Sequence, residues 1–169
     1  MYLSDMINKN LILLNLNSKE KKTIIEEIAG LFYQEKVIKD KNSFVDAIKK
    51  REGIESTAIG EGVAIPHGKS EGVKELKVAF ARSSEGVDFK SLDKKSVHLI
   101  FMIAAPLAVK VEYLQCVAKI ARLLKSKSLK EKLLSAENNK EVMNIIKSFD
   151  KQLPEKLAVK TKEGRVIHK

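Results

Sequence analysis

The amino-acid sequence predicts a single α/β domain, and three of its properties lead to this prediction. The chain has 169 residues, which is long enough to enclose one hydrophobic core and short for two. Hydrophobic residues make up 44% and charged residues 32%, as in ordinary globular proteins. Short apolar runs typical of buried strands alternate with segments whose apolar residues recur every three or four positions, as on one face of a helix.

The first expected elements are a strand and a helix. Residues 11–16 form an apolar run typical of a short buried strand, which Asn17 and Ser18 end. Ser18 is the expected N-cap of a helix that continues to about Glu35, because its hydroxyl can accept a hydrogen bond from a free backbone N–H. The buried stripe expected on this helix consists of Ile24, Ile28, Leu31 and Phe32.

A second helix is expected near residues 43–52. Four side chains share one of its faces, at the spacing i, i+3, i+4 and i+7: Phe44, Ala47, Ile48 and Arg51. Arg51 therefore lies at the end of the buried face, where an arginine either caps a helix or belongs to a functional site. A glycine-rich segment follows, and residues 63–65 are expected to form a short strand within it.

Two further strands, residues 77–81 and 97–103, are expected to be joined by a polar loop. A helix is expected after Pro106, at the end of the second of these strands. The apolar side chains expected to face the core from this helix are Leu114, Val117, Ala118, Ala121 and Leu124.

Two capped helices are expected to close the domain. Ser128 and Glu131 have the spacing of a capping box, and Asn138 with Glu141 forms a similar start. Residues 153–169 alternate only weakly between apolar and polar side chains, which fits either a loose tail or an edge strand. We therefore expect a domain over residues 1–150 and a C-terminal tail over residues 151–169.

Composition excludes several classes of protein. The longest apolar stretch, residues 99–109, is too short to cross a bilayer, so no direct membrane insertion is expected. Residues 1–10 lack the basic and apolar regions of a signal peptide. The single cysteine, Cys116, leaves no disulfide to form within the chain. These features predict a soluble cytoplasmic protein.

The formal charge of +10 raises the question of nucleic-acid binding. Residues 1–118 contain 18 Lys and Arg against 16 Asp and Glu, whereas residues 119–169 contain 14 against 6. The C-terminal excess is mostly lysine with one aromatic residue, Phe149, while nucleic-acid surfaces more often combine arginine with stacking aromatics. We interpret it as a solvated surface and expect no nucleic-acid partner.

Of the three histidines, His67 is the candidate for chemistry. His98 falls inside an expected strand, which favours a half-buried structural role, and His168 lies at the extreme end of the chain. His67 follows Pro66 at the end of an expected strand and precedes Gly68. Proline stiffens the approach and glycine allows the chain to turn sharply away, so the imidazole is expected to be exposed yet held in orientation.

An imidazole in that position suits phosphoryl transfer. With a reference pKa of about 6.5, a neutral His67 offers a nucleophilic nitrogen near neutral pH, and Arg51 can bind a phosphate as a bidentate fork. Other kinds of site lack a component: no ligands cluster at zinc spacing, and no glycine-rich loop with Lys-Ser/Thr is present for a nucleotide. Cys116 is expected to pack within a helix rather than to act as a nucleophile.

A long motif surrounds these two residues. It consists of Arg51-Glu52 followed by Ser56-Thr57-Ala58-Ile59-Gly60-Glu61-Gly62-Val63-Ala64-Ile65-Pro66-His67-Gly68. This motif closely resembles the signature of the fructose/mannitol-type enzyme IIA family of the bacterial phosphotransferase system, including its nitrogen-regulatory branch. The main departure is Val63, where the family pattern has isoleucine. The resemblance continues through residues 87–89 and 97–106 and covers roughly residues 5–150.

The resemblance implies both a fold and a relay function. The family fold is a mixed β-sheet flanked by helices on both faces, which agrees with the alternation of strands and helices. The histidine of the motif, here His67, accepts a phosphoryl group from HPr or its nitrogen-branch counterpart and, in sugar systems, passes it to an enzyme IIB. Arg51 matches the arginine beside the phosphorylation site. The family uses no metal and no organic cofactor.

One position departs from the family pattern. A second active-site histidine usually lies seven residues after a proline, and counting from Pro106 reaches Tyr113. A phenol can donate a hydrogen bond to a phosphate but carries no positive charge. Tyr113 either replaces the neutral form of that histidine without further effect, or it alters phosphate stability or the choice of partner. We expect it to face His67 and to contact the phosphate.

Three functions follow from these observations. The first is a phosphotransferase that relays phosphate to a sugar permease through an enzyme IIB. The second is a regulatory module of the nitrogen branch, in which phosphorylation of His67 controls binding to target proteins. The third, nucleic-acid binding through the basic C-terminal third, has the least support. We expect the first and keep the second as its alternative.

Overall fold

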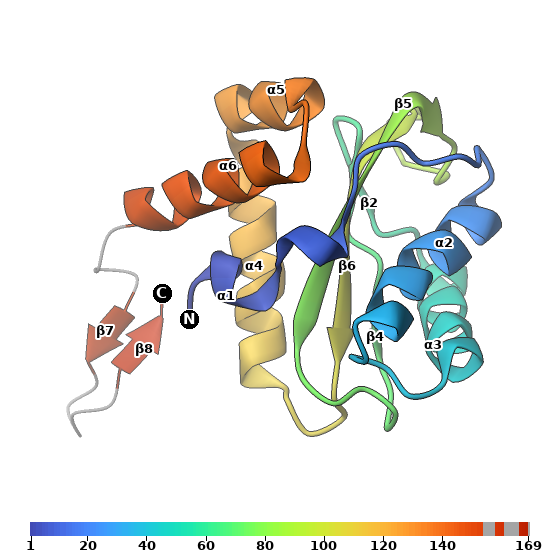
Figure 1. The fold of residues 1–169 in the computed structure, drawn as a ribbon, viewed down its shortest axis with the longest axis horizontal. Coiled ribbons are helices and arrows are strands. Elements are labelled where there is room, and N and C mark those ends of the chain that lie inside the picture. Colours follow the sequence, from blue (N-terminus) through green and yellow to red (C-terminus); the bar gives the residue numbers. More distant parts are fainter. Residues whose placement is uncertain (154–157, 161–165, 169) are drawn as a thin grey trace.

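The computed structural model describes residues 1–153, 158–160 and 166–168. Its elements in chain order are α1 (Leu3–Met6), the 3-10 helix η1 (Lys9–Leu11), β1 (Ile12–Leu13), α2 (Lys21–Gln34), α3 (Lys41–Ile54), β2 (Ala58–Gly60), β3 (Val63–Ala64), β4 (His67–Lys69), β5 (Lys77–Val87), β6 (Val97–Ala105), α4 (Val111–Lys125), α5 (Lys127–Ser135), α6 (Asn139–Gln152), β7 (Ala158–Lys160) and β8 (Val166–His168). They form three layers, with α2 and α3 on one face of a central sheet and α1, α4, α5 and α6 on the other (Figure 1).

The central sheet is mixed, which confirms the predicted fold class. Its strand order is β1-β5-β6-β3-β2, and β4 also pairs with β6. Three of the pairings are parallel (β1 with β5, and β3 and β4 with β6), and two are antiparallel (β5 with β6, and β2 with β3). Helices cover both faces of this sheet (Figure 1), as the resemblance implies.

Strands β3 and β4 lie along the same edge of β6 and share one register. Val63 pairs with Leu99 and His67 pairs with Ile103, so the offset between the paired residues is the same in both strands. Pro66 separates the two strands because it has no backbone N–H to donate, while its carbonyl accepts a hydrogen bond from the N–H of Ile103 (2.9 Å). Among the described strands, β2 pairs with β3 and not with β4. In this part of the chain, β4 therefore pairs with β6 alone.

Helices α2 and α3 bury their predicted faces but begin at other residues. The N-cap of α2 is Glu20, and the predicted cap at Ser18 is wrong: the Ser18 hydroxyl accepts a hydrogen bond from the N–H of Glu20 (3.1 Å) in the turn before the helix. The α3 helix begins two residues earlier than predicted, where Asp40 caps it by accepting from the N–H of Ser43 (3.2 Å). The predicted core residues that are fully buried on these helices are Ile24, Ile28, Phe32, Phe44 and Ile48.

The face that α4 presents to the core differs from the predicted one. Leu114 was expected to be the first inward residue, but it is 65% exposed, and Ala118 is also exposed. The side chains that are buried are Tyr113, Cys116, Ile120, Leu123 and Leu124. Two adjacent apolar stripes run along this helix, and helical spacing alone does not decide which one the sheet covers.

The two last helices differ in how well their starts are predicted. Ser126, rather than Ser128, caps α5 by accepting a hydrogen bond from the N–H of Leu129 (3.2 Å), so the predicted cap is wrong. The start of α6 is confirmed, because Asn138 accepts from the N–H of Glu141 (2.9 Å). Among the helices that the structure describes, none has the length and apolar character needed to span a bilayer.

Two strands also differ from their predicted lengths. The strand β1 covers only two of the six residues expected at 11–16. The strand β5 continues well past the predicted residues 77–81, and a bulge interrupts its pairing with β6. Gly86 lies in this irregular part with φ of +90°, and a Cβ there would come within 2.7 Å of the Ser96 side chain. Glycine is therefore required for the extension.

The last described helix, α6, ends at Gln152, close to the predicted C-terminal boundary of the domain. Buried Asp150 accepts hydrogen bonds from the N–H groups of Leu3 and Ser4 (2.9 Å each), which ties the two ends of the domain together. The division at residue 150 itself stays a prediction. In the expected tail, β7 and β8 pair antiparallel in a small sheet of their own rather than at the edge of the central one. Residues 154–157, 161–165 and 169 lie outside the described part.

Candidate functional site

His67 is the first residue of β4, directly after the break at Pro66. The sequence predicted that Gly68 would turn the chain away, and this is wrong, because the chain continues as a strand paired with β6. A Cβ on Gly68 would lie 3.0 Å from the Cδ1 atom of Ile48, so the glycine instead permits α3 to approach the strand closely. Ladder pairing on one side and α3 on the other hold the backbone of His67 in place.

Two hydrogen bonds orient the imidazole of His67. The Nδ1 atom lies 2.8 Å from the carbonyl oxygen of Ile65, and because a carbonyl only accepts, Nδ1 carries the proton. The Nε atom of Arg51 donates to Nε2 (3.1 Å). Since Nε2 accepts this bond, it holds the lone pair of the ring. The nitrogen of His67 with a lone pair available to a phosphoryl group is therefore Nε2, and it faces Arg51.

The surroundings of His67 favour the neutral ring. Burial lowers the pKa of His67 below its ordinary value of about 6.5, and the nearby cations Arg51 and Lys69 lower it further. The hydrogen bond to Ile65 and the carboxylate of Glu52 act in the opposite direction. Because the net change in pKa is downward, the ring loses its proton at a lower pH than free histidine and is neutral at pH 7.

Arg51 makes two contacts, one as a helix cap and one within the candidate site, whereas the sequence suggested one or the other. Its Nη1 atom donates to the carbonyl oxygen of Glu55 (2.8 Å), the residue that follows the last turn of α3. Its Nε atom donates to His67. Arg51 thus caps the C-terminus of α3 and at the same time lies against the candidate nucleophile. The cap holds the guanidinium beside the ring while part of its fork faces the site.

Tyr113 contacts His67 from α4, on the face of the sheet opposite α3 (Figure 1). It lies in the first turn of α4, is 8% exposed, and places its ring centroid 5.4 Å from that of His67 in an edge-to-face arrangement. Burial raises the pKa of Tyr113 to about 12, against a smaller lowering by Arg51. The phenol therefore stays protonated at physiological pH. The structure brings His67, Arg51 and Tyr113 together, and their roles in transfer stay predictions.

These pKa shifts lead to an expected pH profile. With Tyr113 neutral, phosphoryl acceptance should follow one ionisation between about pH 5 and 8, that of His67, with a midpoint below about 6.5. The rate should rise as pH increases through this midpoint and then level off, because the neutral ring is the nucleophile. Tyr113→His should add a second, coupled ionisation and slow hydrolysis of the phosphohistidine at mildly acid pH, where the new group is charged.

The measurement is a pH series of phosphoryl transfer and of phosphoprotein lifetime for the wild type and Tyr113→His. Tyr113→Phe is the matched control, because it keeps the ring and introduces no titrating group. Identical profiles and lifetimes for Tyr113→His and wild type would show that Tyr113 has no part in the reaction.

Sequence analysis missed the role of Glu52, which organises the loop between α3 and β2. Its carboxylate accepts hydrogen bonds from the backbone N–H and the hydroxyl of Thr57, and it pairs with Lys21 of α2 (2.7 Å). The carbonyl of Thr57 in turn accepts from the N–H of Ile65 (3.1 Å), the residue whose own carbonyl holds His67. A chain of bonds therefore runs from the end of α3 to the imidazole. The adjacency of Glu52 to Arg51 in the motif was the signal available for it.

Lys69 is a second residue that sequence analysis missed. It lies two positions after His67 in β4, and its Nζ atom lies 4.6 Å from the centroid of the Tyr113 ring. Alternation along a strand puts residues i and i+2 on the same face, so the strand assignment would have pointed to it. The predicted turn at Gly68 concealed this relation.

Residues discounted from sequence lie elsewhere. The Nδ1 atom of half-buried His98 bonds to the carbonyl of Ser83 (2.8 Å), which agrees with a structural role. Cys116 is buried, and burial raises the pKa of its thiol to about 12, which makes it a poor nucleophile. The side chain of His168 lies outside the described part. Over residues 1–153, no three His, Cys, Asp or Glu side chains are grouped closely enough to hold a metal ion.

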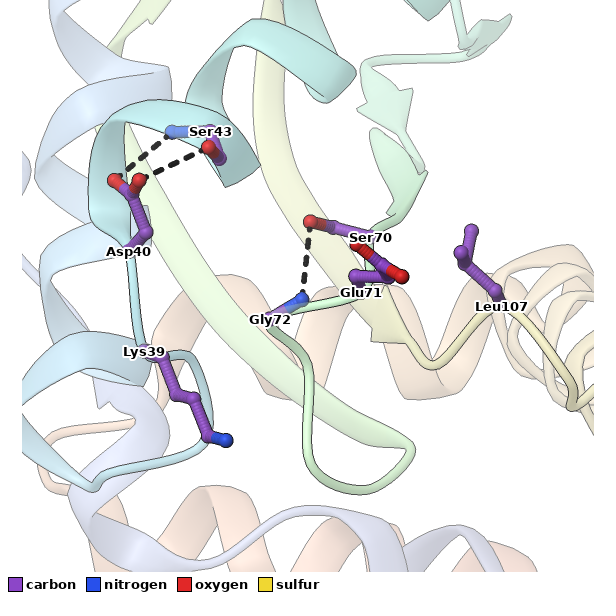
Figure 2. Close-up of a pocket in the computed structure, with 7 residues that line it drawn as sticks. All are labelled: Lys39, Asp40, Ser43, Ser70, Glu71, Gly72 and Leu107. Carbon is purple, nitrogen blue, oxygen red and sulfur yellow. Dashed lines mark hydrogen bonds between the residues drawn. The ribbon is translucent and has the colours of Figure 1, made fainter.

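An open pocket of about 630 Å³ lies beyond the C-terminal end of β4 and beside the start of α3. Figure 2 shows two pairs of its lining residues bonded to each other: Asp40 accepts from the N–H and hydroxyl of Ser43, and the Ser70 hydroxyl accepts from the N–H of Gly72. None of the three predicted site residues lines it. The candidate site is the surface around His67 and not this pocket.

Comparisons with known proteins converge on one family. Residues 5–149 match the profile described as "Phosphoenolpyruvate-dependent sugar phosphotransferase system, EIIA 2". The chain is 37% identical over 151 residues to the fructose-specific EIIABC component of Bacillus subtilis (strain 168), a match that covers 89% of this chain and 24% of that protein. The chain thus spans about a quarter of the length of that relative.

Two solved structures have the same fold. The nitrogen regulatory protein IIA-Ntr from Neisseria meningitidis superposes with a TM-score of 0.80 at 33% identity, covering 85% of this chain and 98% of that one. The mannitol enzyme IIA of Escherichia coli, solved in complex with phosphorylated enzyme IIB, superposes with a TM-score of 0.73 at 23% identity, covering 83% of this chain and 96% of that one.

Proposed function

This chain belongs to the EIIA 2 family of the phosphoenolpyruvate-dependent sugar phosphotransferase system, and we propose that it accepts a phosphoryl group on His67 from an HPr-type phosphocarrier protein and passes it to an enzyme IIB. The observation that carries the proposal is the state of His67: a neutral ring with its proton on Nδ1 and its lone pair on Nε2. A ring in this state is ready to act as a nucleophile. We propose the cytoplasm as its compartment, because phosphoenolpyruvate supplies the donor there.

The transfer needs only a nucleophile, positioning and charge stabilisation. The lone pair on Nε2 attacks the phosphorus of the donor phosphohistidine, and the donor N–P bond breaks as the new N–P bond forms. The Nδ1–H bond to Ile65 (2.8 Å) balances the positive charge that the imidazole gains during attack. Passing the group to an enzyme IIB is the same step, with Nε2 as the leaving atom.

Arg51 must change partner during this reaction. Its Nε atom bonds to Nε2 in the unphosphorylated protein, so it must leave that nitrogen before phosphorus can approach. The bond from Nη1 to Glu55 can keep the side chain in place while Nε turns to an equatorial phosphoryl oxygen. The guanidinium would then stabilise negative charge at the point where it gathers in the transition state.

The proposal is tested by incubating the purified chain with phosphoenolpyruvate, enzyme I and HPr. Intact-mass spectrometry should show the gain of one phosphate, which is labile in acid and stable in alkali, as a phosphohistidine is. Adding an enzyme IIB should then remove that phosphate from the chain. Failure to gain phosphate in a mixture that phosphorylates another EIIA of the family would overturn the proposal.

A regulatory role is the second candidate, and the similarity to IIA-Ntr of Neisseria meningitidis favours it. In this case the phosphate on His67 would control binding to target proteins instead of being passed on. The two roles share the first step and differ in the second. A phosphorylated chain that no enzyme IIB dephosphorylates, and that loses or gains a bound protein partner with its phosphate, would support the regulatory role.

A further inference from the structure

We propose that Lys69 is a second cationic phosphate ligand of this site, held on the Tyr113 ring while His67 is unphosphorylated and bound to a phosphoryl oxygen afterwards. The proposal rests on the proposed function, because it requires a phosphate on His67. It adds a residue to which sequence analysis assigned no role.

The backbone places Lys69 on the same side of the strand as His67. Both residues pair in register with β6, His67 with Ile103 and Lys69 with Ala105. Between them, Gly68 points toward α3, where a Cβ would meet the Ile48 side chain. Because side chains alternate along a strand, His67 and Lys69 project from the opposite side. Tyr113 of α4 lies on that side and contacts both of them.

The tyrosine ring connects the two side chains. Its centroid lies 5.4 Å from the imidazole centroid and 4.6 Å from the Nζ atom of Lys69. A cation over an aromatic face is attracted to it, but this attraction is weaker than a hydrogen bond between an ammonium and a phosphate oxygen. The ring can therefore hold the ammonium close to His67 and release it when a phosphate arrives.

The negative charge of a phosphoryl group on His67 would not be fully offset by Arg51, so a second cation would stabilise it. A phosphoryl group on nitrogen carries nearly two negative charges near pH 7, as phosphate monoesters do, and the one guanidinium in contact with His67 offsets only part of them. Glu52, the acidic group that acts on His67, is already paired with Lys21 (2.7 Å). Within the described residues, Lys69 forms no ion pair with a carboxylate, so its ammonium can turn to the phosphate.

The test compares Lys69→Gln with Lys50→Gln, because Lys50 is an exposed lysine next to Arg51 on α3. Both variants lose one positive charge near the site. We expect Lys69→Gln to shift the phosphoryl equilibrium with HPr toward phospho-HPr about tenfold, and Lys50→Gln to shift it little. Lys69→Arg should restore most of the equilibrium, because it keeps the charge.

Phosphorus NMR supplies a readout that a purely structural role would not change. The second ionisation of the phosphoryl group on His67 should have a higher pKa in Lys69→Gln than in wild type, because a nearby cation favours the dianion. Equal equilibria and equal phosphoryl pKa values in Lys69→Gln and Lys50→Gln would overturn the role of Lys69 and leave the proposed function intact. A wild-type chain that gains no phosphate would overturn both.

Discussion

Replacing His67 by alanine is expected to abolish the acid-labile phosphate that the chain gains from phosphoenolpyruvate, enzyme I and HPr. In the described structure, His67 is the histidine whose Nε2 lone pair faces the guanidinium of Arg51. Its loss removes the nucleophile itself, so no residual transfer by positioning is expected. Intact-mass spectrometry measures the outcome, and a variant that still gains one acid-labile phosphate would show that another residue is the acceptor.

His98 offers a matched control for this experiment. It is also half-buried in a strand, and its Nδ1 atom bonds to a backbone carbonyl at the same distance, 2.8 Å, as that of His67. It differs from His67 in that none of the described arginines donates to its Nε2 atom. His98→Ala should therefore keep its phosphate gain provided that circular dichroism shows an intact fold. Loss of phosphate in both variants with intact folds would contradict the assignment to His67 alone.

Arg51→Gln is expected to slow phosphoryl transfer by about 10- to 100-fold. A charge-assisted hydrogen bond to a phosphate oxygen contributes about 1.5–3 kcal/mol, which corresponds to a change in rate of that size when it acts in the transition state. Rapid-quench measurement of transfer from phospho-HPr gives the rate. Arg51→Lys should recover only part of it, because an ammonium lacks the planar fork that can bond to Glu55 and the phosphate together.

The double role of Arg51 requires a second readout. Because Arg51 also caps α3 through Glu55, a loosened helix end would also slow transfer in this variant. Arg51 lowers the pKa of His67, so Arg51→Gln should move this pKa upward and the midpoint of the acceptance profile to higher pH. A helix-capping role alone would leave the pKa of His67 and the midpoint of the profile unchanged. An unchanged midpoint in a folded Arg51→Gln, whatever its rate, would return Arg51 to a purely structural role.

Much of the candidate site could be predicted from sequence because its signal is local. The motif from Arg51 to Gly68 is nearly continuous, and a proline and a glycine around one histidine restrict a backbone whatever the rest of the chain does. The alternation of apolar runs and helical stripes is equally local, and it predicted the α/β class and the buried faces of α2 and α3. Such signals depend on neighbours within a few residues, all of which are visible in the sequence.

The exact helix starts and the buried face of α4 could not be predicted in this way, because neighbouring residues offered more than one suitable choice. Ser128 has the same capping chemistry as Ser126, which is the actual cap of α5, and α2 begins at Glu20, which makes no side-chain cap bond. Where each helix starts therefore depends on how it packs. On α4, the stripes through Tyr113 and Leu114 are both apolar, and contact with the sheet buries the first and leaves the second 65% exposed. Helix phase against a sheet is a property of the packed molecule.

The contacts that complete the site come only from tertiary structure. Tyr113 is 46 residues from His67 and meets it because the first turn of α4 places the two rings in contact. Lys69 reaches the same ring only because β4 continues through Gly68 as a strand. By itself the sequence determined which residue is the candidate nucleophile and which arginine lies beside it. The folded chain decided the protonated nitrogen of His67, the neutral state of its ring and the cation available on its other side, because each depends on burial and on partners distant in sequence.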